Sequence, residues 1–173
     1  MTTEQSSTRT YDLLLKGGRV IDPANNLDDP LDVAISGRHI ALVAKDISPA
    51  LARTVADVSG HVVTPGLVDI HAHFYGIIGS VLPDAHCIPQ GTTTAVDAGG
   101  SGHLTFDDFN ESVINPSIMN IFALLNIVGE GMVGLPEQDI EDMSVDLTSA
   151  KIAQRPDRIV GVKVAHYMGP GWE

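Results

Sequence analysis

The stretch Thr64-Pro65-Gly66-Leu67-Val68-Asp69-Ile70-His71-Ala72-His73-Phe74 decides how the larger part of this chain folds. Its Pro-Gly pair is a turn signal, and the apolar run that follows is typical of a strand buried on both faces. The run ends in two histidines two residues apart, and side chains at that spacing in a strand point the same way. Neutral imidazoles that converge on one point can bind zinc, nickel or iron, although such pairs also occur by chance. The context favours metal binding, because β/α barrels carry ligands at the carboxyl ends of their strands.

Composition and charge limit the classes of protein that this chain can be. It has 173 residues, of which 43% are hydrophobic and 18% charged, as in globular proteins. The net charge of -12 argues against nucleic acid or an anionic membrane as partner. The single cysteine, Cys87, excludes an intrachain disulfide and fits a reducing compartment. Without a signal-peptide core or a run of ~20 apolar residues, a cytoplasmic protein is expected, and a homo-oligomer is compatible with the composition.

The rhythm of the sequence changes near residue 65. Residues 1–10 are polar and predicted to be disordered. Residues 11–64 contain short β-type runs broken by turns, which predict a small antiparallel sandwich. From residue 65 onward, strand-like and helix-compatible stretches alternate, as in β/α units around a parallel sheet. The predicted strands are residues 67–71, 92–98, 121–128 and 159–164, and the predicted helices are residues 84–90, 106–113 and 146–155, the last capped by Asp146.

The count of β/α units defines the expected fold class. Residues 65–173 hold four units, whereas a closed barrel needs eight units and about 250 residues. The prediction is therefore an α/β protein: the first half of a (β/α)8 TIM-type barrel, preceded by a small β-sandwich that is part of a composite domain. Because half a barrel exposes strand edges and apolar surface, we expect the N-terminal part of a longer protein, or a half completed by another chain.

Several segments resemble the amidohydrolase superfamily, and within it the dihydroorotase-like deacetylases. The resemblance rests on Tyr11-Asp12-Leu13-Leu14-Leu15-Lys16-Gly17-Gly18-Arg19-Val20-Ile21-Asp22-Pro23 and on Pro65-Gly66-Leu67-Val68-Asp69-Ile70-His71-Ala72-His73. Gly91-Thr92-Thr93-Thr94-Ala95-Val96-Asp97-Ala98-Gly99 and Ile159-Val160-Gly161-Val162-Lys163 fit the same group. The resemblance covers nearly all of residues 11–173. It is specific for the superfamily and does not identify a substrate.

The resemblance implies a barrel with two divalent metal ions, commonly zinc. His71 and His73 match the first-strand histidines that bind the more buried ion. Lys163 matches a fourth-strand lysine that carries a carbamate derived from CO2 and bridges both ions. Two histidines on later strands and a general-base aspartate complete the family's site, and the chain ends before their positions. No general base is therefore expected within this chain.

Lys163 can also be considered without the family. It lies between Val162 and Val164 in an apolar strand, where burial favours the neutral amine over the ammonium ion. A neutral amine can react with CO2 to give a carbamate whose oxygens bind metal. The alternative is a lysine paired with a carboxylate, or one that extends its amine to the surface. The family pattern favours the carbamate.

Other polar residues are weaker candidates for the site. Asp69 shares the parity of the two histidines and could orient them from behind, as ligating histidines usually require. Asp97 could orient a ligand or cap the next loop, and the structural role is favoured. Ser101 and His103 follow on a loop where contact with substrate is expected. His166 and Tyr167 follow Lys163 on the corresponding loop, although a lone loop histidine is more often simply solvated.

The favoured hypothesis is hydrolysis of a C–N bond in a small amide or cyclic amide. A metal-bridging hydroxide would attack the carbonyl, because two cations lower the pKa of water. One alternative is that this chain is a truncated, inactive fragment or an assembly partner with partial metal binding, since three ligands without a general base give no turnover. Another is ester or phosphotriester hydrolysis at the same site. The substrate class rests on the family resemblance alone.

Overall fold

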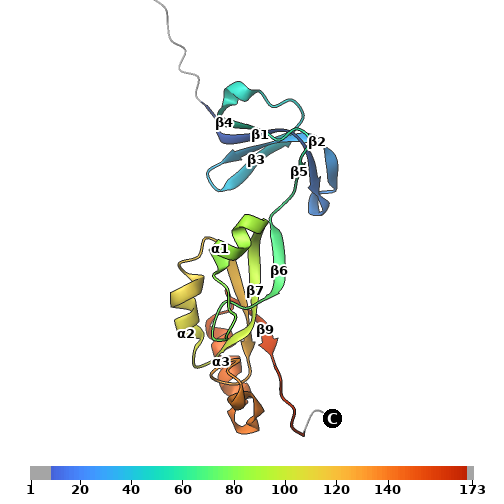
Figure 1. Cartoon of the computed structure of the whole chain (residues 1–173). Helices are drawn as coiled ribbons and strands as arrows, with labels where there is room; N and C mark the ends of the chain where they lie inside the picture. The colour runs from blue at the N-terminus through green and yellow to red at the C-terminus, as the bar shows by residue number, and fades with distance from the viewer. Residues whose placement is uncertain (1–8, 171–173) are drawn as a thin grey trace, which may run out of the picture. The chain divides into compact units, whose positions relative to one another are not determined.

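The computed structural model describes residues 9–170, which form two compact units that divide between Pro65 and Gly66 (Figure 1). Of the stretch predicted to be disordered, residues 1–8 lie outside the described part of the chain. Thr10 is tied into the first unit, because its backbone N–H donates to the carbonyl of Leu51 at 2.8 Å.

The first unit is a five-stranded mixed sheet. Its strands are β1 (Tyr11–Asp22), β2 (Leu27–Ser36), β3 (His39–Ala44), β4 (Ala52–Asp57) and β5 (Val62–Val63), with the short helices η1 (Pro23–Asn25) and η2 (Pro49–Leu51) between them. The order is β3-β2-β1-β4, and β5 also pairs with β1. The expected all-antiparallel arrangement is wrong, because β4 and β5 run parallel to β1. Such pairings join strands distant in sequence, so local turn signals did not reveal them.

Strand β1 is one long strand rather than the two short runs suggested by Gly17-Gly18. Its pairing with β2 shifts register between Leu15 and Gly18, and Gly17 has a φ of +81°, which glycine adopts without strain. Beside this irregularity the carboxylate of Asp32, which is 4% exposed, accepts three hydrogen bonds. The donors are Lys16 Nζ at 2.7 Å and the backbone N–H groups of Gly17 and Ile47 at 2.8 and 2.9 Å. Asp32 thus holds β1, β2 and the segment after β3 together.

Asp32→Asn is expected to lower the free energy of unfolding of this unit by about 2 kcal/mol, because hydrogen bonds to a buried charge are lost or weakened. Burial raises the pKa of the Asp32 carboxyl, but the three donors outweigh burial and hold the pKa below its usual value. The stabilisation is therefore full above the unfolded-state pKa of about 3.9 and is lost as the pH falls through the lower folded-state pKa. Urea denaturation at pH 7 and pH 2 measures both effects. Asp28→Asn is the control, because the Asp28–Arg19 pair is exposed and should contribute little.

The second unit is a four-stranded, all-parallel sheet in the order β6-β7-β8-β9. Its strands are β6 (Leu67–Ala72), β7 (Thr92–Gly102), β8 (Asn120–Asn126) and β9 (Ile159–Lys163). The connections contain α1 (Pro83–Cys87), η3 (Ile88–Gln90), α2 (Phe106–Phe109), the π-helical turn η4 (Asn110–Ile114), η5 (Leu135–Gln138), η6 (Ile140–Asp142) and α3 (Val145–Gln154). The expected α/β fold with the first units of a parallel barrel is confirmed. The cap of α3 is corrected, because Ser144, not Asp146, accepts the N-terminal hydrogen bond, from Leu147.

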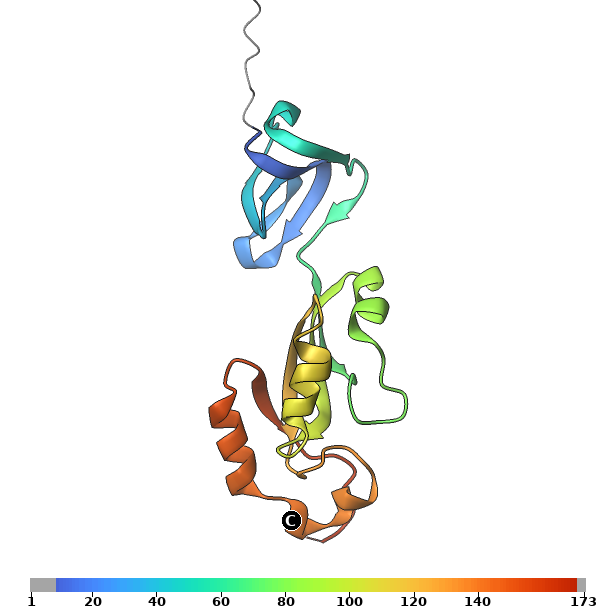
Figure 2. The same ribbon diagram turned by 90° about the vertical axis from the view of Figure 1, so that its left-hand side faces the viewer.

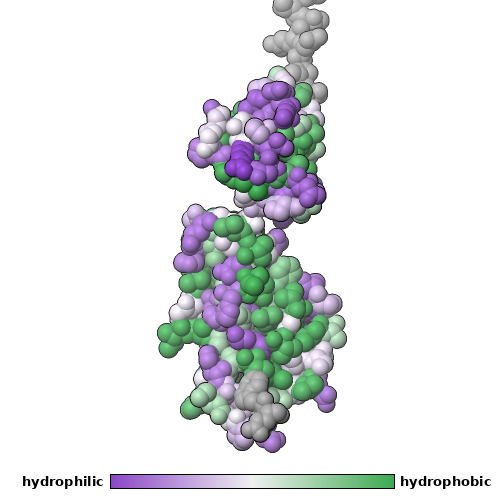
Figure 3. Space-filling view, turned by 90° about the vertical axis from the view of Figure 1, so that its right-hand side faces the viewer, coloured by the Kyte–Doolittle hydropathy of each residue, from purple (hydrophilic) through white to green (hydrophobic). Residues whose placement is uncertain are grey.

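One face of this sheet carries the core. Phe106 and Phe109 of α2 are fully buried against strand residues such as Ala95, Ile121 and Leu125, and Figure 2 shows α2 lying across the strands. The expectation that β6 is buried on both faces is wrong, since Val68 and Ile70 are 60% and 74% exposed. β6 is an edge strand that pairs with β7 alone among the described residues. Figure 3 shows apolar surface on this unit. Within residues 9–170, no helix has the length and apolar character needed to cross a membrane.

Candidate metal centre

The carboxyl ends of the four parallel strands bring the candidate residues to one edge of the second unit. His71 lies at the end of β6, and His73 follows that strand. Lys163 is the last residue of β9 and pairs in register with Asn126, the last residue of β8. The parallel topology thus places residues that are ninety positions apart at the same end of the sheet. This placement is what the sequence predicted for the two histidines and the lysine.

The two imidazoles lie close together. Their ring centroids are 5.4 Å apart, and their planes are nearly perpendicular at 82°. The Nδ1 atom of His73 is buried and has no hydrogen-bond partner. Burial lowers the pKa of His73; Asp97 opposes this shift, whereas the charges of His71, Lys163 and His166 add to it. A neutral ring with a buried, unpartnered nitrogen suits a metal ligand, because ligation requires the deprotonated nitrogen.

Lys163 approaches this pair from β9. Its charge adds to the lowering of the pKa of His73. The lysine stem packs directly on Gly99 of β7: a Cβ atom at Gly99 would lie 2.4 Å from Lys163 Cγ. The expectation that Lys163 is buried in an apolar strand is not met, because the side chain is only partly buried and Val162 and Val164 are 48% and 38% exposed. β9 is the other edge strand of the sheet, which explains this exposure.

His71, His73 and Lys163 are the residues of this chain that could bind the metal ions implied by the family resemblance. Among residues 9–170, no three His, Cys, Asp or Glu side chains gather closely enough to hold an ion. His71 and His73 therefore need a donor of another kind, and Lys163 is the nearby residue that could supply one after conversion to a carbamate. The unpartnered His73 nitrogen and the nearby amine fit such a site. The residues of this chain are compatible with the implied metal centre.

Asp97 acts on the backbone behind the histidines. It is fully buried at the level of Ala72 in the sheet, and its carboxylate accepts from the N–H groups of Phe74 at 2.8 Å and Gly100 at 2.7 Å. Burial raises the pKa of the Asp97 carboxyl, and those backbone donors and His73 oppose the shift. Asp97 therefore links the segment after His73 to the last part of β7. Of its two predicted roles, the structure favours capping the loop.

Asp69 bonds to the backbone of the first histidine. Its carboxylate accepts from the backbone N–H of His71 at 2.9 Å. The pairing of β6 with β7 shifts register between Asp69 and Ala72. Burial raises the pKa of the Cys87 thiol in α1, and the Asp69 charge adds to that shift. The role of Asp69 in orienting the histidine rings stays a prediction.

The four remaining candidates, Ser101, His103, His166 and Tyr167, have different surroundings. Ser101 is fully buried with an unpartnered Oγ, whereas His103 borders a separate cavity of about 160 Å³ with Glu130, Glu141 and Asp142. Burial lowers the pKa of His103, and the Lys151 charge adds to this effect. The charge of His166 adds to the lowering of the pKa of His73. The hydroxyl of Tyr167 donates to the carbonyl of Pro170 at 2.7 Å.

The structure adds two residues that the sequence analysis missed. Asn126 is fully buried; its Nδ2 donates to the carbonyl of Gly99 at 3.1 Å, and its Oδ1 accepts from Val128. It thereby supports the backbone on which Lys163 rests. Glu137 is 1% exposed and bonds to the ring of His166. A polar residue at the end of an apolar strand was the available signal for Asn126, as it was for His71, whereas Glu137 lies in an irregular connection and gave no local signal.

Comparisons with known proteins identify the family. No family model matches the sequence. A deacetylase of Agrobacterium fabrum, Atu3266, is 34% identical over 150 residues, which are 82% of this chain and 37% of that protein. The crystal structures of an adenine deaminase and of a dihydroorotase each match with a TM-score of 0.75 and 30% identity; they cover 88% and 87% of this chain. The chain belongs to the amidohydrolase superfamily.

This amidohydrolase chain spans about two fifths of the length of the relatives it matches. The structure of a D-aminoacylase described as having a binuclear metal centre is also similar, with a TM-score of 0.52 and 28% identity, and covers 66% of this chain.

Proposed function

We propose that the complete protein hydrolyses a C–N bond in a small N-acyl or cyclic amide compound. The observation that carries the proposal is that His71, His73 and Lys163 lie at, or just after, the carboxyl ends of β6 and β9, with His73 Nδ1 buried and unpartnered. Relatives named deacetylase and dihydroorotase support the reaction class. These relatives support the type of bond that is hydrolysed, and the small N-acyl or cyclic amide substrate is our proposal.

His71, His73 and a carbamate on Lys163 would hold two divalent ions, with zinc as the expected metal. When bound, these ions supply Lewis acidity that lowers the pKa of the attacking water and polarises the scissile carbonyl. His73 stays neutral because burial lowers its pKa, so its nitrogen remains available as a ligand. Asp97 holds the backbone of Phe74 and so fixes the turn that follows His73. Gly99 leaves room for the stem of Lys163, and Asn126 holds the carbonyl of Gly99.

The test measures metal content and substrate range together. Purified complete protein is expected to contain about two zinc ions per chain and to hydrolyse N-acetyl amino acids or dihydroorotate faster than ester and phosphotriester analogues. His73→Asn should weaken metal binding by at least 10–100-fold, which is the loss typical even of residues that only support a ligand. The matched control is His61→Asn, an exposed histidine of the first unit, which should keep full metal content. Faster hydrolysis of the phosphotriester, or metal retention by His73→Asn, would contradict the proposal.

A further inference from the structure

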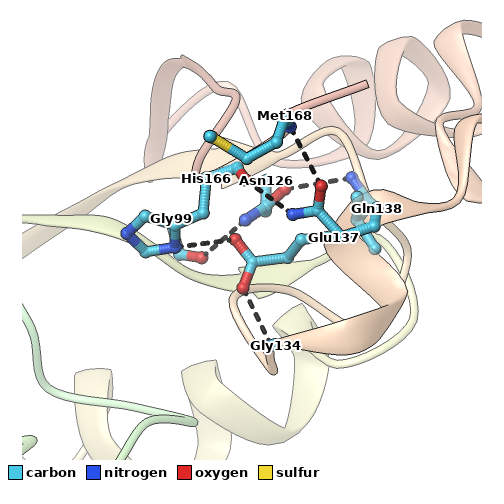
Figure 4. Close-up of polar contacts among 8 residues, drawn as sticks. Gly99, Asn126, Gly134, Glu137, Gln138, His166 and Met168 are labelled. Atoms are coloured by element: carbon cyan, nitrogen blue, oxygen red, sulfur yellow. Dashed lines mark hydrogen bonds and ion pairs between the residues drawn. The ribbon is translucent and has the colours of Figure 1, made fainter. Parts of the chain in front are cut away.

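Two neighbouring residues of η5 hold the loop that follows β9. Glu137 Oε2 lies 3.2 Å from His166 Nδ1, and Glu137 Oε1 accepts from the N–H of Gly134 at 2.8 Å. Gln138 spans the same loop, because its Nε2 donates to the carbonyl of His166 and its Oε1 accepts from the N–H of Met168. Figure 4 shows Glu137 and Gln138 side by side against this loop. The β9 loop is thus fixed from the connection between β8 and α3.

The position of His166 carries a conformational cost. Its φ of +58° is left-handed, a region that non-glycine residues occupy at a cost of order 1–3 kcal/mol. The ring is exposed, with 71% of its side-chain surface open, while the carboxylate that holds it is 98% buried. The contact between the buried Glu137 carboxylate and this exposed ring contributes little to the stability of the core. It orients the imidazole: with Nδ1 bonded to Glu137, Nε2 is the ring nitrogen left to bind a ligand.

Beside His166 lies a cavity of about 390 Å³ with mainly apolar walls. One wall comes from the loop after β6 and the other from the connection after β8; the lining residues that matter here are Ile77, Ile78, Met132, Val133, Glu137 and His166. Binding pockets for small molecules measure about 300–1,000 Å³. The cavity therefore has room for a substituent such as a branched alkyl group.

The cavity adjoins the candidate metal centre. Gly76 lines the cavity and lies against the carbonyl of Gly100, since a Cβ atom at Gly76 would be 2.6 Å from that oxygen. Gly100 follows Gly99, on which the stem of Lys163 packs. His166 lines the same cavity and follows Lys163 by three residues. A molecule whose reacting bond lies at the metal centre can thus extend a substituent toward Ile77 and Val133.

We propose that this cavity is the specificity pocket of the enzyme: it takes an apolar substituent of the amide substrate, and His166 Nε2, oriented by Glu137, accepts a hydrogen bond from the amide N–H of the same substrate. Glu137 is then a positioning residue that acts through His166. This inference rests on the proposed amide hydrolysis and adds to it the substrate class, N-acyl compounds with a branched apolar side chain.

The first experiment measures kcat/KM of the complete, zinc-loaded protein for N-acetylglycine and for racemic N-acetylalanine, N-acetylvaline and N-acetylleucine. We expect kcat/KM to rise along this series. Val133→Phe fills the cavity and should lower the N-acetylleucine to N-acetylglycine ratio of kcat/KM by about tenfold or more, the discrimination that a hydrophobic pocket provides. Val145→Phe is the matched control, because Val145 is exposed on α3 and does not line the cavity, so its ratio should match that of the wild type. An unchanged ratio in Val133→Phe overturns the pocket.

The second experiment addresses Glu137 and His166. Glu137→Gln should raise KM for N-acetylleucine about tenfold while kcat changes less than twofold, and His166→Ala should have the same pattern. Imidazole ¹⁵N spectra should show His166 protonated at Nδ1 in the wild type and a mixture of tautomers in Glu137→Gln. A fall in kcat as large as the rise in KM, or an unchanged His166 tautomer in Glu137→Gln, overturns the positioning role.

Failure of the proposed function is distinguishable from failure of this inference. If the wild type hydrolyses none of the amides, the proposed function is wrong, and calorimetric binding of the same compounds then tests the pocket directly. Tighter binding of N-acetylleucine than of N-acetylglycine, lost in Val133→Phe, supports the pocket. Equal affinities for the two compounds overturn it.

Discussion

Lys163→Ala in the complete protein should lower kcat/KM for its amide substrate by about 100-fold or more, because loss of a residue that merely supports a metal ligand already costs 10–100-fold. Lys163 stands at the end of β9, and we propose that it is the additional donor that the two histidines need. Without it, residues 9–170 offer no third ligand of the usual kinds. Zinc content measured by mass spectrometry should fall in parallel with activity.

Lys163→Arg tests whether Lys163 acts through a carbamate or through its positive charge. Arginine keeps the charge and much of the stem, but its guanidinium stays protonated and cannot react with CO2. We therefore expect this variant to be as inactive as Lys163→Ala. ¹³C-labelled bicarbonate should give a carbamate carbon signal in the wild type and none in either variant, a result that does not depend on turnover. Lys45→Ala, an exposed lysine of the first unit, should retain both the signal and the activity. Full activity of Lys163→Arg would exclude the carbamate.

The strands and strand-end residues that the sequence predicted correctly are those determined by local sequence patterns. Strands β6, β8 and β9 of the second unit are each a local apolar run, and parallel β/α units place the carboxyl ends of such runs at one edge. For this reason the sequence predicts that His71, His73 and Lys163 lie at one edge of the sheet although ninety residues separate them. The burial of β6 and β9 could not be predicted in the same way, because exposure depends on which strands lie beside an edge strand. Val68 and Ile70 look like core residues in sequence and are exposed in this sheet.

Other features depend on geometry that no short stretch encodes. Asp69 has the right parity in sequence, but the pairing of β6 with β7 is irregular between Asp69 and Ala72, and its carboxylate accepts from the backbone N–H of His71. The parallel pairing of β4 and β5 with β1 arises from long-range contacts. Glu137 contacts His166 across 29 positions, from a connection without periodic pattern. Positions where a regular pattern fails are commonly functional or strained, and His166 is such a position.

Gly99→Ala should displace Lys163 and reduce metal content by tenfold or more, although Gly99 itself offers no ligand. A Cβ atom there would lie 2.4 Å from Lys163 Cγ and 2.7 Å from Lys163 Cβ, distances that real Cβ atoms do not show. The lysine stem must therefore shift, and its amine moves away from His73. The φ of +92° adds backbone strain that is independent of this clash. Zinc content at equal protein concentration measures the first effect, and the midpoint of thermal unfolding measures the sum of both.

Gly79→Ala is the matched control, because it isolates backbone strain from the steric effect. Gly79 has a φ of +98°, nearly that of Gly99, and a Cβ atom added there meets nothing within 4 Å. Both variants should lose about 1–2 kcal/mol from the left-handed conformation. Only Gly99→Ala should also lose metal, since only its methyl group meets Lys163. If the two variants retained equal zinc, the packing of Lys163 on Gly99 would not determine the position of the amine, and the assignment of Lys163 as a ligand would lose its structural support.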